Sequence, residues 1–486
     1  MNRISHNGYI INKVNFTPQE LDAIKYDLTL SPKENHVASK MMAKKQDNEI
    51  RVYRENDKKM YIPRFYGERK FGSNSFVNEL KPGENISVAF TNKLRDYQEK
   101  IISVYMSHVR IDVGGGGILE VPCGFGKTIM ALNICSRIKK KTLVIVHKEF
   151  LMNQWIDRIQ EFLPTARVGK IKGKVFDIEE KDIVIGMIQT MYDRDYPPNT
   201  FSSFGLTIID EVHRIGSEEF SKTLLKVVTP FMLGISATVE RKDGLSELIY
   251  MFIGDKIYSE TRKEKDGVEV RVIQYDNEDE KYKEEEYDYR GNIKYSTMIS
   301  RISDFGPRQE FIMRILKDLI SENSEKQIMV LSHKRNLLNF LEDEVTKAGF
   351  ASCGLYIGGM KQNVLNDSET KQIVLATYSM AAEALDIKTL NTLVMVSPKT
   401  DIIQSVGRIL RTKESGKIII DLVDSHNVFQ NQWKKRKTFY KKSKYLIKMV
   451  GVENYDMADV ENWKVAFDPE KETATKEKKQ CQLILS

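Results

Sequence analysis

The strongest constraint on the fold is an alternation of short apolar runs with helical stretches, which begins near Thr91. Runs of this kind, rich in β-branched residues, are typical of strands buried on both faces of a parallel sheet. Because amphipathic stretches of helical length separate them, the pattern predicts a doubly wound α/β fold. In this part of the chain the runs are GILEVP, KTLVIVH, DIVIGMI, LTIIDEVH and FMLGISAT.

The alternation is interrupted once and then resumes. Eight acidic residues lie between Asp276 and Asp288, a composition typical of a charged connector or insertion. Strand-like runs then return as QIMVLSH, FASCGLYI, KQIVLAT, NTLVMVS and KIIIDLVD. We therefore expect two tandem parallel-sheet domains, at residues 91–258 and 306–450, separated by a linker or insertion at 259–305.

The two ends of the chain follow neither pattern. Residues 1–90 hold short mixed segments with 15 Lys or Arg and 11 Asp or Glu, and EIRVYRENDKKMYIPRFYG is typical of a hairpin. They predict a small N-terminal α+β accessory domain, either with ordinary surface charge or with a nucleic-acid-binding role. Residues 451–486 are expected to be a C-terminal extension that finishes in a mobile tail.

A basic run with aromatic residues follows the second domain. Residues from Lys434 to Lys448 include eight basic residues and no acid. Two interpretations remain open. The run is a solvated helix that packs its aromatic side chains on the second domain, or it contacts the backbone of a nucleic-acid duplex.

Composition restricts the cellular compartment and the kinds of partner that we expect, but it does not identify the function. The 486 residues carry a net charge of +7, which is compatible with nucleic acid as a partner. The cysteines, with no metal-binding spacing, are expected to be free thiols in a reducing compartment. With no visible signal peptide or membrane span, we expect a soluble intracellular protein without a membrane partner. The cysteines are Cys123, Cys135, Cys353 and Cys481.

A glycine-rich loop connects the first strand-like run to a helix expected from about Thr128. In PCGFGKT, Gly124 and Gly126 let backbone N–H groups approach phosphate oxygens, and the start of the helix adds partial positive charge. Lys127 would reach the β- and γ-phosphates, and the Thr128 hydroxyl would hold Mg²⁺. Val121 replaces the first glycine of the usual pattern, so the loop alone leaves a chance match open.

The run LTIIDEVH supplies the acids that such a loop needs. Asp210 would bind Mg²⁺, and Glu211 would orient and polarise the attacking water. His213 would sense the γ-phosphate. Acids at the carboxyl end of a parallel strand lie beside the phosphate loop, so the two sequences together predict a site that uses ATP and Mg²⁺.

The order of the motifs resembles superfamily 2 helicases over about residues 91–450. DEVH resembles motif II, LRDYQ the adenine-reading Q motif, and LGISATVERKDG motif III; QSVGRILR resembles motif VI. LVIVHKEFLMNQW and IVIGMIQTM resemble the segments that face nucleic acid, and VLSHKRNLL and ATYSMAAEALDI resemble motifs IV and V. The resemblance implies two tandem RecA-like domains, and hydrolysis that opens and closes the cleft between them.

The resemblance also implies roles for individual residues. Arg408 and Arg411 share one helix face, so both would reach the γ-phosphate as arginine fingers. The catalytic residues would be Lys127, Asp210, Glu211, Gln404, Arg408 and Arg411. The nucleotide would contact Gln98, Cys123, Gly124, Phe125, Gly126, Lys127, Thr128 and Asp386. Coupling of hydrolysis to movement would use His213, Ser236 and Thr238. Backbone contacts to nucleic acid would come from Lys148, Gln154, Gln189, Thr190, Lys334 and Thr377.

Finer resemblances point to a subgroup. The Pro-Cys-Gly of PCGFGKT and the pair Arg241 and Asp243 resemble XPB-like and UvsW-like DNA helicases, although Ala384 replaces a common glycine of motif V. YIPRFYG resembles the transcript-release helicases of large DNA viruses of the poxvirus type. A viral protein would act in the host cytoplasm, a virus factory or the virion.

The expected activity is an ATP-dependent DNA helicase or translocase that remodels duplexes or releases nascent transcripts. A single strand would lie in a groove across both RecA-like domains, with DNA favoured over RNA. We expect a monomer that works with transcription or replication machinery. Two alternatives stay open, an RNA helicase and a nucleic-acid clamp that does not hydrolyse ATP.

Overall fold

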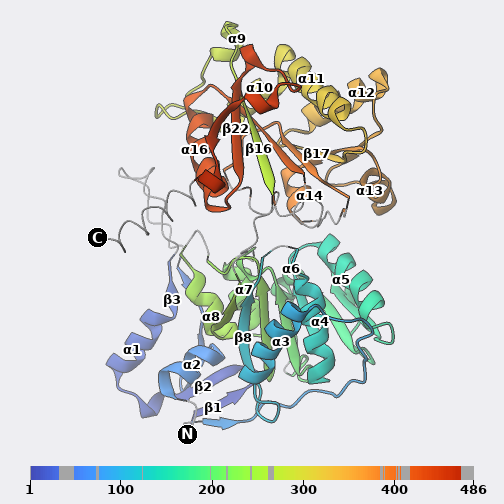
Figure 1. The fold of residues 1–486 in the computed structure, drawn as a ribbon. Helices are drawn as coiled ribbons and strands as arrows, with labels where there is room; N and C mark the ends of the chain where they lie inside the picture. Colours follow the sequence, from blue (N-terminus) through green and yellow to red (C-terminus); the bar gives the residue numbers. More distant parts are fainter. Residues whose placement is uncertain are drawn as a thin grey trace, which may run out of the picture. The chain divides into compact units, whose positions relative to one another are not determined.

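The fold is described from a computed structural model of the chain. The residues that it describes are 2–31, 49–72, 76–122, 124–197, 199–214, 217–240, 244–260, 267–383, 387, 389–400, 402, 406 and 416–471. The chain divides into two compact units, residues 1–262 and residues 263–486 (Figure 1).

The core of the first unit is a sheet of parallel strands with one antiparallel edge. Its strands are β8 (Gly115–Glu120), β9 (Thr142–Val146), β10 (Val168–Lys172), β11 (Val175–Phe176), β12 (Ile183–Met187), β13 (Leu206–Asp210), β14 (Phe231–Ser236) and β15 (Lys256–Ser259). Their order is β11-β10-β12-β9-β13-β14-β8-β15, and among the described strands only β11 runs antiparallel to its neighbour. Every residue of β9, β13 and β14 is buried, as expected for a parallel sheet covered on both faces.

Helices connect these strands and bury their apolar faces against the sheet. In α5, the buried residues Leu151, Met152, Trp155, Ile159 and Phe162 lie on one helical face. The helices are α3 (Asp96–His108), α4 (Lys127–Ile138), α5 (Glu149–Phe162), α6 (Ile188–Asp193), α7 (Ser217–Leu224) and α8 (Ser246–Ile253), with a 3₁₀ turn, η2 (Val212–Arg214).

A small α+β module precedes this sheet, as the sequence predicted. Its sheet joins β1 (Asn2–Ser5), β2 (Gly8–Asn12), β5 (Arg54–Glu55), β6 (Lys59–Ile62) and β7 (Phe76–Asn78), and β5 and β6 form the expected hairpin. The other elements are η1 (Lys13–Asn15), α1 (Pro18–Asp27), α2 (Arg64–Phe71) and the strand pair β3 (Thr29–Leu30) and β4 (Ile50–Arg51).

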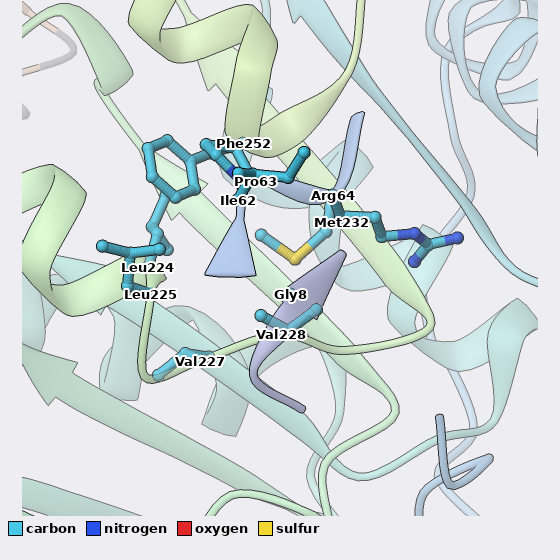
Figure 2. Close-up of a pocket in the computed structure, with 10 residues that line it drawn as sticks. All are labelled: Gly8, Ile62, Pro63, Arg64, Leu224, Leu225, Val227, Val228, Met232 and Phe252. Carbon is cyan, nitrogen blue, oxygen red and sulfur yellow. The ribbon is translucent and has the colours of Figure 1, made fainter. Parts of the chain in front are cut away.

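The module packs closely on the rest of the first unit. The buried Arg64 guanidinium donates to the carbonyl oxygens of Thr229 at 3.0 Å and Pro230 at 2.8 Å. A Cβ on Gly116 would lie 2.4 Å from the Phe65 ring, so only glycine fits there. The cavity between the module and the rest of the first unit, shown in Figure 2, has a volume of only about 10 Å³. That is room for about one water, which makes this a packed interface and not a ligand site.

The second unit repeats the parallel-sheet architecture. Its strands are β16 (Val268–Tyr275), β17 (Ile328–Ser332), β18 (Cys353–Tyr356), β19 (Ile373–Thr377), β20 (Thr392–Met395), β21 (Lys417–Asp424), β22 (Leu446–Gly451) and β23 (Lys464–Phe467). Their order is β18-β19-β17-β20-β21-β16-β22-β23, and of the strands described here only β23 is antiparallel. Two such α/β sheets agree with the tandem RecA-like fold expected from the sequence.

The segment 259–305, expected to be a linker or insertion, contributes a strand to this sheet. β16 lies between β21 and β22 and pairs with both. The strand was not recognised because VEVRVIQY carries charges, which the fold neutralises. Arg271 is bound by Glu322 at 2.9 Å and by Glu269 at 2.6 Å. The rest of the segment holds α9 (Glu280–Lys283) and α10 (Tyr295–Asp304).

The remaining helices and the C-terminal residues complete the second unit. The helices are α11 (Gly306–Glu322), α12 (Arg335–Ala348), α13 (Gln362–Glu369), α14 (Tyr378–Glu383) and α16 (Asn427–Lys442). After β22 come η3 (Val452–Asn454), η4 (Val460–Asn462) and the edge strand β23. The end of the chain, expected to be a mobile tail, lies outside the described residues from 472 on. Among the helices in the described ranges, none has the length and apolar character needed to cross a membrane.

A fully buried ion pair ties α11 to the end of β21. The Arg308 guanidinium contacts the two carboxylate oxygens of Asp424 at 2.6 Å and 2.9 Å and also donates to the Val396 carbonyl. Both side chains are 0% exposed. Each charge is therefore stable in the interior only because the other is present.

We predict that Arg308→Ala destabilises the second unit by about 3–5 kcal/mol, because Asp424 would stay buried without a counter-charge. Equilibrium urea unfolding measures the effect. The control is Lys347→Ala on α12, where the ion pair with Glu344 is exposed and should contribute less than about 1 kcal/mol. Equal losses in both variants would contradict the role given to the buried pair.

Candidate nucleotide site and nucleic-acid-facing residues

The glycine-rich loop has the strand-loop-helix setting expected from the sequence. Val121 is buried just after β8, and its N–H donates to the Ser236 carbonyl at 2.8 Å, so it extends the strand. Gly124 and Gly126 have φ of +86° and +78°, in the left-handed region that favours glycine. α4 begins at Lys127, which places the amino terminus of a helix at the end of the loop.

Gln98 holds the loop from the side. Its amide donates to the Phe125 carbonyl at 3.0 Å and accepts from the Arg95 N–H at 3.0 Å. A Cβ on Gly126 would lie 2.4 Å from the Gln98 amide nitrogen, so glycine is needed for space as well as for its φ. The hydroxyl of Tyr97, which the sequence analysis did not single out, donates to the same Phe125 carbonyl at 3.3 Å.

The adjacent acids lie at the carboxyl end of β13, and one of them contacts the loop lysine. Lys127 Nζ is 3.1 Å from Glu211 Oε1, with both side chains largely buried. Glu211 has φ of +50°, an unfavourable conformation for a residue other than glycine. The loop and the acids, distant in sequence, thus form one site.

The Asp210 carboxylate sits in a buried, electrostatically unfavourable position. Burial, followed by the charge of Glu211, raises the pKa of Asp210 to about 6. Hydrogen bonding from Trp155 and the charge of Lys127 act in the opposite direction. The Trp155 indole donates to Asp210 Oδ2 at 2.9 Å, a contact that the sequence analysis missed because it depends on how α5 packs on the sheet.

The residues predicted to couple hydrolysis to movement form a hydrogen-bonded chain next to the acids. His213 Nδ1 lies 2.6 Å from the Ser236 hydroxyl and 3.5 Å from Glu211 Oε2. The Ser236 hydroxyl also donates to the Thr238 carbonyl. Thr238 itself is exposed and takes part through its backbone. These contacts connect Glu211 to the segment after β14 through His213 and Ser236.

Glu120 is a further site-proximal acid that the sequence analysis missed. It ends β8 directly before the loop and accepts from the Val239 N–H at 2.8 Å and the Ser259 hydroxyl at 2.7 Å. Burial acts to raise its pKa, but these hydrogen bonds and that of Lys256 lower it below its ordinary value. Its position at the end of a strand, directly before a glycine-rich loop, could have identified it from the sequence.

Except for Gln154, the predicted nucleic-acid contacts of each unit lie at or just after the carboxyl ends of its parallel strands. Lys148 and Gln189 follow the parallel neighbours β9 and β12, and the Gln189 amide donates to the His147 carbonyl at 3.2 Å. In the second unit, Lys334 lies just after β17, and Thr377 is the last residue of β19, which pairs with β17. The Thr190 hydroxyl accepts from the Gly173 N–H, while Gln154 lies further along α5.

The site has the donors that a nucleoside triphosphate and Mg²⁺ require. Loop N–H groups, a helix amino terminus and Lys127 match phosphate oxygens. Asp210 and the half-buried Thr128 offer the oxygen ligands that Mg²⁺ takes alongside phosphates and waters. Five residues expected to act here lie outside the described residues: Cys123, Asp386, Gln404, Arg408 and Arg411.

Comparison with known proteins decides the family. Residues 91–241 match the family described as "Type III restriction enzyme, res subunit", and residues 312–413 match "Helicase conserved C-terminal domain". A protein of Acanthamoeba polyphaga mimivirus, provisionally named ATP-dependent RNA helicase L396, is 34% identical over 456 residues, which are 92% of this chain and 86% of that protein. The chain belongs to the superfamily 2 helicases of large DNA viruses.

Other similarities agree with this family. The helicase is 26% identical over 392 residues to a protein of Invertebrate iridescent virus 6, provisionally named helicase 161L, which covers 75% of this chain and 84% of that protein. The structure of S. cerevisiae Dbp5 bound to RNA and ADP BeF3 aligns with a TM-score of 0.53 and 13% identity, over 76% of this chain and 93% of that one. The Dbp5 match supports the fold, and the family makes the helicase a nucleic-acid-dependent ATPase.

The raised pKa of Asp210 predicts a pH-dependent stability of the nucleotide-free helicase. The folded state binds this proton more tightly than the unfolded chain, so stability falls as pH rises from about 4 to about 6. Asp210→Asn keeps an acceptor for Trp155 and removes the charge. We expect it to be more stable than the parent by about 2–3 kcal/mol above pH 6, with no difference near pH 4.

Urea unfolding in the presence of a metal chelator, at a series of pH values, measures this difference. Asp182→Asn is a control with the opposite sign. Burial acts to raise the pKa of Asp182, but hydrogen bonds and charge from Arg167 lower it, so its stabilisation is lost as pH falls. If Asp210→Asn and the parent show the same pH dependence, the ionisation of Asp210 is not unfavourable in the fold.

Proposed function

We propose that this helicase is a DNA-dependent motor that couples ATP hydrolysis to movement along a strand and to duplex remodelling or transcript release. The ion pair between Lys127 and Glu211 carries the proposal, because it joins the phosphate loop to the acids. A triphosphate in the loop would compete with Glu211 for the Lys127 ammonium. Glu211 would then be available to the attacking water.

The remaining residues of the site would each have a separate role in hydrolysis. The N–H groups of Gly124, Phe125 and Gly126 would cradle the phosphates, and Gln98 would hold the loop or reach the adenine. Mg²⁺, held by Thr128 and Asp210, would neutralise charge on the phosphates. Arg408 and Arg411 would stabilise the charge of the transition state, and Gln404 would act beside them.

Movement would follow from a link between the acids and the segment after β14. His213 contacts Ser236, and Ser236 contacts the backbone of Thr238. Loss of the γ-phosphate would change the position of Glu211 and, through this chain, the loop that follows β14. Nucleic acid would lie along the carboxyl edges of the two sheets, on backbone contacts that include Lys148, Gln189 and Lys334.

RNA is the second candidate polymer. Relatives in Acanthamoeba polyphaga mimivirus and African swine fever virus carry the provisional name of ATP-dependent RNA helicases. The DNA proposal is supported by the resemblance of PCGFGKT to XPB-like and UvsW-like proteins. The ATPase rate with equal concentrations of single-stranded DNA, duplex DNA and RNA separates the two. Stronger stimulation by RNA would overturn the DNA proposal.

We also propose the domain boundaries, the oligomeric state, the partners and the location of the helicase. We propose an accessory domain at 1–90 and motor domains at 91–258 and 306–450. β16 from the connecting segment 259–305 and β23 from the extension 451–486 complete the sheet of the second motor domain. The helicase would act as a monomer with transcription or replication machinery. In an infected cell it would work in the cytoplasm, a virus factory or the virion.

Two variants of the central ion pair test the hydrolysis mechanism. We expect Lys127→Ala to abolish productive ATP binding, because the phosphates lose their cation. We expect Glu211→Gln to retain ATP binding and lose turnover, since an amide cannot polarise the water. Nucleotide binding by fluorescence and phosphate release measure the two steps. A nucleic-acid clamp would instead show no turnover in the parent, although nucleic acid binds.

The arginine-finger assignment has a separate test. Arg408→Ala should slow nucleic-acid-stimulated hydrolysis by roughly 10³-fold or more, because a guanidinium stabilises the transition state. Single-turnover kinetics at saturating ATP measures the effect, and Arg335→Ala, an exposed arginine of the second unit, is the control. Normal turnover in Arg408→Ala would move the role to Arg411.

A further inference from the structure

α16 presents a face of lysines that the motor motifs do not account for. Lys434, Lys435, Lys441 and Lys442 are all exposed. The aromatic residues of the same run point inward, with Trp433 and Tyr440 buried at 4% and 0% exposure. The helix therefore packs its aromatics on the sheet, as one interpretation of the sequence predicted, and keeps its charges outside.

A buried arginine fixes the orientation of this helix. Arg436 donates to the two carboxylate oxygens of Asp421 on β21 at 2.8 Å and 2.9 Å and to the Lys399 carbonyl at 2.8 Å. The Tyr440 hydroxyl donates to the same carboxylate at 3.1 Å. The basic residue that faces inward is thus neutralised, and the helix cannot rotate its lysines away from solvent.

The four exposed lysines are not neutralised in the same way. Within the described residues, no carboxylate lies within ion-pair distance of them, and Lys434 donates only to the Asn431 side chain at 3.2 Å. The nearby acidic residues lie beside lysines other than these four. Asp459 lines a groove beside Lys437, and Asp468 lines a cavity with Lys444. The charge on this face is therefore available to an external anion.

The spacing of the lysines fits two parallel rows of anions. Lys434 and Lys441 are seven residues apart and share one stripe, and Lys435 and Lys442 form a second stripe about 100° around the axis. Each stripe is roughly 10 Å long. A single strand that runs along the helix would meet one stripe, whereas the two backbones beside a duplex groove would meet both.

We propose that this face of α16 binds the two phosphate backbones that flank the major groove of duplex DNA. The inference rests on the proposed function, which makes DNA the polymer. The major groove of B-DNA is about 12 Å wide and admits a helix, whereas that of duplex RNA is too narrow. A membrane is disfavoured because the exposed face carries no large apolar side chain among the described residues.

The test replaces the four lysines together as Lys434→Gln, Lys435→Gln, Lys441→Gln and Lys442→Gln. Binding to a 30-base-pair DNA duplex and to single-stranded DNA is measured by fluorescence anisotropy at several salt concentrations, without nucleotide. For duplex DNA, the slope of log affinity against log salt should become shallower by about 3–4, since each lost phosphate contact contributes ~0.9. The slope for single-stranded DNA should change by no more than about 1.4, since a strand along the helix would meet one stripe of two lysines and each contact contributes ~0.7.

A control variant removes the same charge from another part of the second unit. It carries glutamine at four other exposed lysines, and its slope should match that of the parent. These are Lys281, Lys283, Lys317 and Lys347. A variant with arginine at the four α16 positions should keep the parental slope, because it keeps the charge, and circular dichroism confirms that each variant is folded.

Three outcomes would overturn the proposal. They are an unchanged duplex slope, an equal loss for single-stranded DNA, and an equal loss in the control variant. Because binding is measured without ATP, the result does not depend on hydrolysis. If the protein binds duplex DNA through α16 but does not hydrolyse ATP, the proposed function is wrong and this inference still holds.

Discussion

Parallel pairing of the strands is the constraint on which the rest of the structure depends. Apart from β11 and β23, the strands of each large sheet run in the same direction, so their carboxyl ends lie at the same edge of that sheet. That edge carries the loop after β8 and the acids after β13 in the first unit. It also carries the predicted nucleic-acid contacts after β9 and β12, and the corresponding edge of the second sheet carries those after β17 and at the end of β19. One topological rule therefore gathers residues that are far apart in sequence.

The candidate site holds charges in an unfavourable arrangement. Asp210 is buried beside Glu211 with a raised pKa, and Glu211 has a left-handed backbone. Lys127 partly neutralises the pair, and Trp155 donates to the buried carboxylate. In the proposed mechanism, a bound triphosphate and its cation would remove this conflict. Strain of this kind is common where a site must exchange one set of partners for another.

Much of the fold could be predicted from the sequence because its signals are local. The strand-like runs, the helical stretches and the glycine-rich loop each depend on residues close in the chain. β16 escaped recognition because its buried charges are neutralised by Glu322, which is on α11. Glu120 and Trp155 were missed for a similar reason, since their partners come from other elements. The described residues leave the predicted roles of Arg408 and Arg411 as predictions.

By itself, the sequence determined the α/β alternation and the order of the motifs, and it predicted the residues of the phosphate loop and the acid pair. These follow from periodicity, glycine conformations and residue chemistry, which act over a few positions. Only the tertiary structure decided that Trp155 meets Asp210, that Gln98 holds the loop, and that Arg436 turns inward while its neighbouring lysines face solvent. Such contacts depend on which helix packs on which strand, and no short stretch of sequence specifies that.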